Sequence, residues 1–295
     1  MKRWLVLLAL LIAAGAALYY SQRHKTETRV GPEGALNALA DAQRELSRVP
    51  AGLARLSDEE EIRIGDTMAT DAAAAMRTGW NERTDAAIER YVNVVGRHVA
   101  VGAQRKLDYR FHYLPDANFV NAFALPGGHV FIGKGLMLLM DTEDELASIL
   151  GHEVEHVDRY HCNERVAVEA RLRGMPLSGL VQLPVALFVA GYNKDQELEA
   201  DRDGTYLAVL AGYSPQGAVR MFQAFERLHQ QYLSKPSSPD QEASQVMVQS
   251  IAGYFRSHPL PQERERQIRQ LIAEKKWPEK KERALQIQLS EAKTG

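Results

Sequence analysis

The residues that could do chemistry are concentrated in one stretch of the sequence, His152-Glu153-Val154-Glu155-His156. Two histidines four positions apart lie one turn apart on the same face of an α-helix. Both imidazoles can therefore reach one metal ion at about 2.0–2.1 Å. Glu153 follows the first histidine and is close enough to take a proton from a water molecule at that ion. The stretch predicts a metal site with a general base beside it.

The surrounding sequence predicts the helix that this site needs. Thr142 and Glu145 have the T-x-x-E spacing of a capping box, which closes the start of a helix. Apolar residues then recur at helical spacing and form a stripe that would face the core. This stripe consists of Leu146, Leu150, Val154 and Val157. One helix would thus be anchored in the core and present metal ligands beside it.

A third ligand is expected from the acidic segment Glu197-Leu198-Glu199-Ala200-Asp201. Glu197 and Asp201 lie one helical turn apart, and the apolar residues after them indicate that this helix packs inward. A glutamate can complete a set of two histidines and one carboxylate around zinc. Asp201 can accept the outer N–H of a metal-binding histidine, for which we favour His152, and so fix its tautomer.

The sequence before the metal-binding helix predicts a small antiparallel sheet. Apolar and polar residues alternate over 107–113, which is typical of a half-buried strand. Two further apolar runs, 120–124 and 129–132, flank Leu125-Pro126-Gly127-Gly128 and predict a hairpin with glycine at its turn.

An exposed edge of this sheet would have a functional use. A strand around Asn121, Ala122 and Phe123 could align an extended peptide by accepting it as a further strand. The alternative is that the hairpin is ordinary scaffold.

Composition limits the remaining possibilities. The 36 basic and 38 acidic residues nearly cancel, so the sequence carries no overall signature of a nucleic-acid-binding protein. The single cysteine, Cys162, excludes an internal disulfide and a cluster of zinc thiolates. We interpret it as a small, partly buried side chain.

Residues 1–25 have the pattern of a targeting segment. Two basic residues precede an apolar run over 4–20, which is at the short end of what can span a bilayer. We interpret it as a retained membrane anchor, because the run is longer than a usual signal-peptide core and has aromatic residues at both ends. The alternative is a signal peptide cleaved near Ala14-Gly15-Ala16.

The rest of the chain is expected to form a linker, one domain and a tail. Residues 26–56 are punctuated by glycine and proline and predict a linker. The folded domain is expected over 57–275, starting at a second capping box, and the charged tail over 276–295 is expected to be a solvated, frayed helix.

Together these motifs resemble the HtpX/BepA/Oma-like gluzincin family of zinc metalloproteases. The stretch HEVEH followed by Glu-Leu-Glu-Ala-Asp is similar to the pattern HExxH…ExxxD. Residues 121–128 running into Gly133-Lys134-Gly135-Leu136, and Ser257-His258-Pro259 downstream, also match. The resemblance covers roughly 57–275, and an ordered set of motifs is far more specific than HExxH alone.

The resemblance implies a fold and a site. The fold would be α+β and mainly helical, a zincin-like domain with the small sheet before the HExxH helix. One zinc ion per chain would be held by His152, His156 and Glu197, with Glu153 as the base.

The resemblance also implies a setting. The protein would act in quality control at the bacterial cell envelope, on unfolded or misassembled proteins. With residues 1–25 as an anchor, the body of a bacterial protein would be periplasmic and held at the inner membrane, or soluble in the periplasm if 1–25 are cleaved.

Two positions depart from known metalloprotease patterns. Glu155 stands where the family often has a small residue, and we expect it to be solvated. His161 follows His156 by five positions, with Arg159 where a glycine would be needed, so it does not match the third ligand of a metzincin.

His258 and Arg264 are further candidates, because both lie in or beside the Ser-His-Pro segment. Pro259 biases His258 away from helical geometry, and a histidine there is ordinarily a turn residue or a helix cap. Against the cleft it could instead occupy the fourth zinc position as a latch, or stabilise the transition state.

The function that these residues predict is zinc-dependent hydrolysis of peptide bonds, with Glu153 as proton acceptor. An alternative of another class is a membrane-tethered zinc protein that binds unfolded clients without cutting them, because a site with four protein ligands is structural. The intact Glu153 favours the enzyme, since a structural site needs no base.

Overall fold

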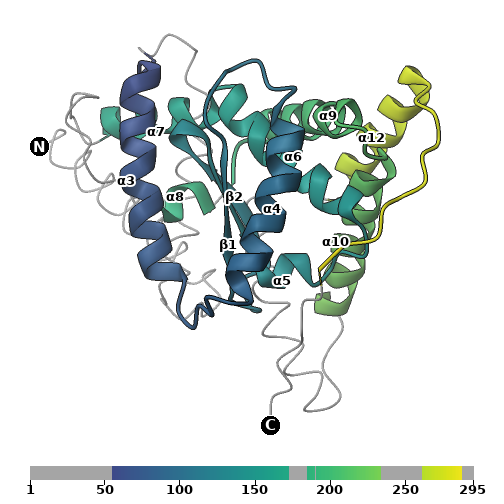
Figure 1. Ribbon diagram of the computed structural model, residues 1–295. Coiled ribbons are helices and arrows are strands. Elements are labelled where there is room, and N and C mark those ends of the chain that lie inside the picture. Colours follow the sequence, from purple (N-terminus) through teal and green to yellow (C-terminus); the bar gives the residue numbers. More distant parts are fainter. Residues whose placement is uncertain (1–54, 173–184, 190, 234–260, 288–295) are drawn as a thin grey trace, which may run out of the picture. The chain divides into compact units, whose positions relative to one another are not determined.

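The computed structural model describes residues 55–172, 185–189, 191–233 and 261–287 (Figure 1). The predicted anchor over 1–25, most of the linker and the segment around His258 lie outside the described residues. Within the described ranges, no helix is both long enough and apolar enough to cross a membrane.

The described chain is mainly helical, as predicted, with one three-stranded sheet. The elements before the metal-binding helix are α3 (Asp58–Met76), α4 (Asp85–Ala100), β1 (Arg110–Leu114), β2 (Ala122–Leu125), η1 (Pro126–Gly128), β3 (His129–Gly133) and α5 (Lys134–Met137). The elements from that helix onward are α6 (Glu143–Asp158), α7 (His161–Leu172), α8 (Ala186–Val189), α9 (Lys194–Leu210), α10 (Gln216–Leu233) and α12 (Pro261–Lys275).

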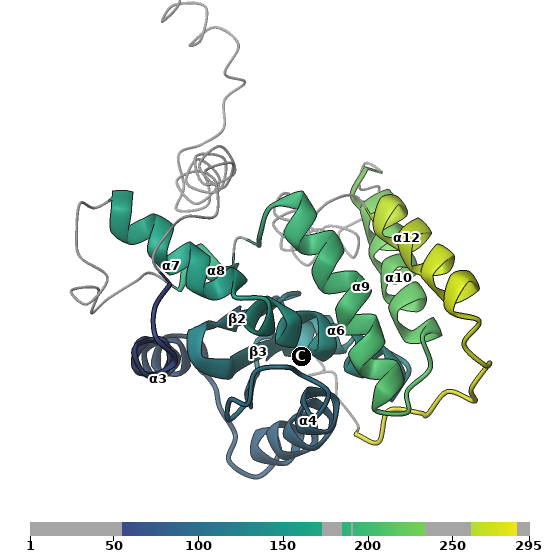
Figure 2. The same ribbon diagram turned by 90° about the horizontal axis from the view of Figure 1, so that it is seen from above.

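Helix α6 is the central element of the fold. It begins at the predicted capping box, in which Glu145 N–H donates to Thr142 Oγ1 at 3.2 Å and Thr142 N–H donates to Glu145 Oε2 at 2.7 Å. Every residue of α6 is buried, because the sheet, α4, α9 and α10 surround it (Figure 2). The predicted apolar stripe is confirmed, since its four members are fully buried. A helix enclosed in this way holds its side chains in fixed positions.

The sheet is mixed rather than antiparallel throughout. The predicted hairpin is confirmed, because β2 and β3 pair antiparallel around the turn η1. The first strand, β1, pairs parallel with β3, in the order β1-β3-β2. The loop over 115–121 leads the chain away from β1. The next strand, β2, therefore does not pair with β1, and β3 lies between the two strands. The alternation of side chains predicts a strand and its two faces, but it does not predict which strand becomes its neighbour.

The residues after α12 correct a second prediction. Residues 276–287 contain no helix, and 283–285 run along the start of α6. Asp144 explains this path, because its Oδ2 accepts a hydrogen bond from Arg283 N–H at 2.6 Å, and Arg283 C=O accepts one from Glu143 N–H at 2.8 Å. The first turn of a helix has backbone N–H groups without helical partners, and an extended segment can satisfy them.

Candidate metal centre

The two histidines of HEVEH meet on the face of α6 that looks toward α9. Their Nε2 atoms lie 3.1 Å apart, and the rings are edge to face at an angle of 85°. His152 is 5% exposed and His156 is 1% exposed. The helix therefore holds two ring nitrogens that point at one place within the protein.

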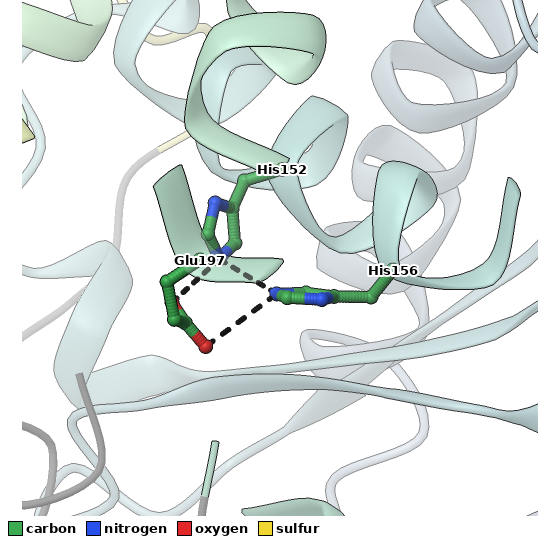
Figure 3. A group of neighbouring side chains, drawn as sticks. All are labelled: His152, His156 and Glu197. Atoms are coloured by element: carbon green, nitrogen blue, oxygen red, sulfur yellow. Dashed lines mark hydrogen bonds and ion pairs between the residues drawn. The ribbon is translucent and has the colours of Figure 1, made fainter. Parts of the chain in front are cut away.

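Helix α9 brings Glu197 to the same place. Asn193 caps this helix by accepting a hydrogen bond from the backbone N–H of Gln196. Glu197 follows in the first turn, with Oε2 3.5 Å from His152 Nε2 and Oε1 3.7 Å from His156 Nε2 (Figure 3). These three side chains come from two helices separated by a long stretch of chain.

Two glycines allow the close approach of α6 and α9. A Cβ atom on Gly151 would lie 2.5 Å from the carbonyl oxygen of Gly204, and one on Gly204 would lie 2.5 Å from the backbone nitrogen of His152. Distances this short are not compatible with any side chain. The pair of glycines thus sets the distance at which Glu197 can reach the histidines.

The three residues fit a metal ion by distance and by chemistry. Ligand atoms around a tetrahedral zinc ion with bonds of about 2.0–2.1 Å lie about 3.3–3.4 Å apart. The distances of 3.1, 3.5 and 3.7 Å between the ligand atoms are close to this value. Among the residues that the structure describes, His152, His156 and Glu197 form the group of three buried ligands suited to an ion.

Asp201 lies behind His152, at the outer nitrogen of its ring. Its Oδ1 is 2.9 Å from His152 Nδ1, whereas Glu197 approaches Nε2. Burial would lower the pKa of His152, but hydrogen bonds to Asp201 and Glu197 raise it to about 10. The carboxylates thus favour positive charge at this point, which a bound cation would also supply.

Arg264 of α12 is fixed on Asp201. Its Nε and one terminal nitrogen each donate to a carboxylate oxygen of Asp201 at 2.6 Å, and this second nitrogen lies 3.7 Å from Glu197 Oε2. Burial would raise the pKa of Asp201, but the guanidinium holds it well below its usual range. The structure therefore brings Arg264 to the centre, next to the residues predicted as ligands, while His258 lies outside the described residues.

Glu153 is buried on the same helix, beside the ligands. Burial raises the pKa of its carboxyl group to about 7, the charge of Glu197 adds to this effect, and His152 and the backbone N–H of Ala124 oppose it. A carboxyl group with this pKa is able both to accept and to release a proton near neutral pH.

Strand β2 is an edge strand of the sheet, and it packs against α6. In an antiparallel pair, backbone groups of alternate residues point toward the partner strand and away from it. Asn121 C=O accepts a hydrogen bond from Gly133 N–H at the end of β3, whereas Ala122 N–H donates to Asn121 Oδ1 at 2.9 Å. Phe123 and its neighbours in β2 are buried.

The sequence did not indicate two residues that contact His156. His161 Nδ1 lies 2.9 Å from His156 Nδ1. The ring of Tyr192 stacks on His156 with centroids 4.0 Å apart, and its backbone N–H donates to Glu197 Oε1 at 2.9 Å. The spacing of five between the histidines was visible, but the turn that aims His161 back at α6 was not.

The expectation that Glu155 is solvated is wrong. Its side chain is buried, and its Oε2 accepts a hydrogen bond from Arg159 Nε at 3.1 Å. Burial raises the pKa of Glu155 to about 7. The acid is therefore part of an ion-pair network that joins the end of α6 to Asp203 of α9.

The comparisons with known proteins agree with this geometry. A family model described as peptidase family M48 matches residues 82–272. The chain is 27% identical over 203 residues to a beta-barrel assembly-enhancing protease of Yersinia pestis, covering 62% of this chain and 41% of that protein. It is 26% identical over 245 residues to the mitochondrial metalloendopeptidase OMA1 of Schizosaccharomyces pombe, covering 78% and 67%.

A third relative is the metalloprotease LoiP of Escherichia coli, 26% identical over 211 residues, with 67% of this chain and 78% of that protein covered. The chain spans less than half of the length of the beta-barrel assembly-enhancing proteases of Yersinia pestis and Vibrio cholerae, namely 41% and 43%. The resemblance found in the sequence is thus matched by a family model over most of the predicted domain.

Proposed function

The chain belongs to peptidase family M48 and is a metalloendopeptidase, and we propose that it uses one zinc ion to cleave misfolded or misassembled proteins of the cell envelope. The observation that carries the proposal is the convergence of His152, His156 and Glu197, with Glu153 buried beside them. When bound there, zinc would supply Lewis acidity and lower the pKa of the attacking water.

The residues of the chain divide the remaining work. Glu153 accepts a proton from the attacking water and transfers it to the leaving amine, which its pKa of about 7 suits. Asp201 holds His152 in the tautomer that leaves Nε2 as a ligand, because its carboxylate accepts a hydrogen bond from Nδ1–H. Arg264 fixes Asp201 and adds a positive charge near Glu197, where it would stabilise negative charge that develops on the substrate.

We place an extended peptide substrate at the edge of β2 that does not pair with β3. The N–H of Ala124 is directed at Glu153, so a strand added along this edge would lie beside the base. Among Asn121, Ala122 and Phe123, the backbone of Ala122 faces this edge, where its N–H donates to Asn121 Oδ1. Asn121 Nδ2 donates to Val189 C=O at 3.2 Å. We therefore place substrate binding along 121–124.

The names of the relatives support the setting that we propose for the reaction. Two of them are named for assembly of β-barrels and one for mitochondria, which favours substrates that are proteins of membranes or the envelope. We propose that residues 1–25 anchor the chain to the inner membrane with its body in the periplasm. A carbonate wash that leaves the full chain in the membrane fraction, and deletion of 1–25 that releases it, would support this.

Digestion of casein tests the activity itself. The full chain is expected to cleave casein, to lose that activity with a zinc chelator, and to regain it when zinc is restored. A protein that binds zinc and casein but cleaves neither casein nor unfolded envelope proteins would contradict the enzyme and favour a client-binding protein.

A further inference from the structure

In each histidine ligand, one ring nitrogen faces away from the metal centre. This nitrogen has a different partner in His156 than in His152. In His156, Nε2 faces His152 and Glu197, so Nδ1 is the nitrogen turned away from the centre. This Nδ1 lies 2.9 Å from Nδ1 of His161. His161 is 3% exposed, and its other nitrogen, Nε2, lies 3.4 Å from Glu199 Oε2.

His156, His161 and Glu199 form a row of neighbouring side chains. The positions of the protons in this row follow from valence. A neutral imidazole carries one N–H and one lone pair. If His156 Nε2 offers its lone pair to a metal, its proton is on Nδ1 and is donated to His161 Nδ1. His161 must then carry its own proton on Nε2, which faces Glu199, and a carboxylate can only accept. The three residues thus have one consistent direction of donation, from the centre outward.

Glu199 is itself held in place. Its Oε1 lies 3.7 Å from Arg159 and 3.5 Å from Arg202, while Oε2 faces His161. Arg159 belongs to the turn after α6, and Arg202 lies on α9 three positions after Glu199. The two arginines orient the carboxylate toward His161, although its side chain is 36% exposed.

The turn between α6 and α7 places His161. Helix α6 ends at Asp158, and Tyr160 has a φ of 62°, which is uncommon for a residue other than glycine. The guanidinium of Arg105 lies 4.1 Å from the centre of the Tyr160 ring and contributes to holding this conformation. The chain changes direction here, and the first residue of α7, His161, contacts His156 in the last turn of α6.

We propose that His161 and Glu199 are positioning residues that fix the tautomer and ring orientation of His156 as a metal ligand. The inference rests on the proposed metal site, and it gives the two histidine ligands different supports. His152 donates directly to the buried carboxylate of Asp201, whereas His156 donates to a neutral ring that passes the hydrogen bond to a partly exposed carboxylate.

The test measures zinc affinity of the full chain by competition with a chromophoric chelator, together with the melting temperature of the metal-free protein. In His161→Leu the acceptor for His156 Nδ1–H is lost, and zinc affinity should fall by about 10–100-fold. In His161→Asn the amide oxygen occupies the position of Nδ1, so affinity should stay within about threefold of wild type. A role that was only structural would not be restored by asparagine.

Glu199→Ala tests the outer end of the row with little risk to folding, because this side chain is partly exposed. We expect zinc affinity to fall by about 3–10-fold. Glu164→Ala is its matched control, since Glu164 of α7 also bonds α9, through Gln196 Nε2 at 2.9 Å, but lies outside the row of hydrogen bonds that starts at His156. This control should bind zinc like wild type.

The outcomes separate this inference from the proposed function. Unchanged zinc affinity in His161→Leu, equal losses in His161→Leu and His161→Asn, or equal affinities in Glu199→Ala and Glu164→Ala would each overturn the inference. If His161→Leu does not fold, the asparagine variant and the glutamate pair still decide it. A wild-type chain that binds zinc with this pattern but cleaves no protein would contradict the function and leave the positioning role standing.

Discussion

The described part of the molecule contains two rows of two histidines and one carboxylate, and one of them ends at the metal centre. The first row is His156, His161 and Glu199. The second is His112, His129 and Asp66, in which His112 Nε2 lies 2.9 Å from His129 Nδ1 and His129 Nε2 lies 2.9 Å from Asp66 Oδ1. Both rows lead to a carboxylate that is partly exposed.

The inner ends of the two rows differ. His156 lies on a helix, where His152 is one turn away and a buried glutamate comes from α9. His112 lies on β1, stacks on Phe131 with centroids 4.4 Å apart, and belongs to no group of three possible ligands within the described residues. Proximity of histidines is therefore not what makes a metal site. Convergence of at least three ligand atoms on one point is required, as at His152, His156 and Glu197.

The largest expected effect comes from substitutions at the metal centre, where the first row ends. Glu153→Gln should lower the rate of proteolysis by about 10²–10⁴-fold while zinc stays near one equivalent, because Glu153 is proposed as the base and not as a ligand. His156→Ala should lose both zinc and activity. Metal content and casein cleavage, measured on the same preparations, check both expectations.

His112→Ala is the matched variant in the second row and should keep zinc and activity. Loss of zinc in Glu153→Gln, or full turnover in that variant, would show that the division between ligand and base is wrong.

A smaller effect is expected where a carboxylate supports a ligand. Asp201→Asn removes the charge that accepts His152 Nδ1–H and should cost about 10–100-fold in zinc affinity or activity. Asp203→Asn, two positions along the same helix, and Asp66→Asn, at the end of the second row, should retain wild-type affinity. Chelator competition measures all three, and similar losses at Asp201 and Asp203 would mean that α9 has been misinterpreted.

Local patterns in the sequence predicted the elements that hold the site. The capping box at Thr142 and Glu145 and the apolar stripe of α6 need only neighbouring residues, and both are confirmed. The proximity of Glu197 to the histidines could be expected from chemistry. Its distance could not, because it depends on the contact between Gly151 and Gly204, which no periodicity indicates.

The features that the sequence did not predict depend on partners far along the chain. The parallel pairing of β1 depends on the path of 115–121, and the extended course of 276–287 depends on Asp144 at the start of α6. The position of His161 was not predicted, because it depends on the φ of 62° at Tyr160, which cannot be inferred from the residue type. In each case a tertiary contact overrides what the local sequence favours.

The smallest effect concerns the pH dependence of stability in the second row. Burial lowers the pKa of His112 to about 3, and the positive charges of His129, Arg77 and Arg110 act in the same direction. Burial also lowers the pKa of His129, although Asp66 opposes this.

The unfolded chain takes up a proton at His112 near pH 6.5, whereas the folded protein does so only near pH 3. The stability associated with neutral His112 is therefore fully present above pH 6.5 and is lost as the pH falls from there toward 3. Between pH 7 and 5 the loss should be on the order of 1 kcal/mol, after allowance for partial exposure of the ring.

His112→Gln keeps a polar group opposite His129 but cannot titrate in this range. When the pH is lowered from 7 to 5, the melting temperature of both proteins should fall. For a fold of this size, the decrease in His112→Gln should be smaller than that of wild type by about 2–4 °C. The difference between the two proteins reports on His112 together with His129, which it contacts. His98→Gln, at an exposed histidine of α4, should follow the wild-type curve. Parallel curves for wild type and His112→Gln would show that His112 binds protons equally in the folded and unfolded states, and that the second row has no part in the acid sensitivity of the fold.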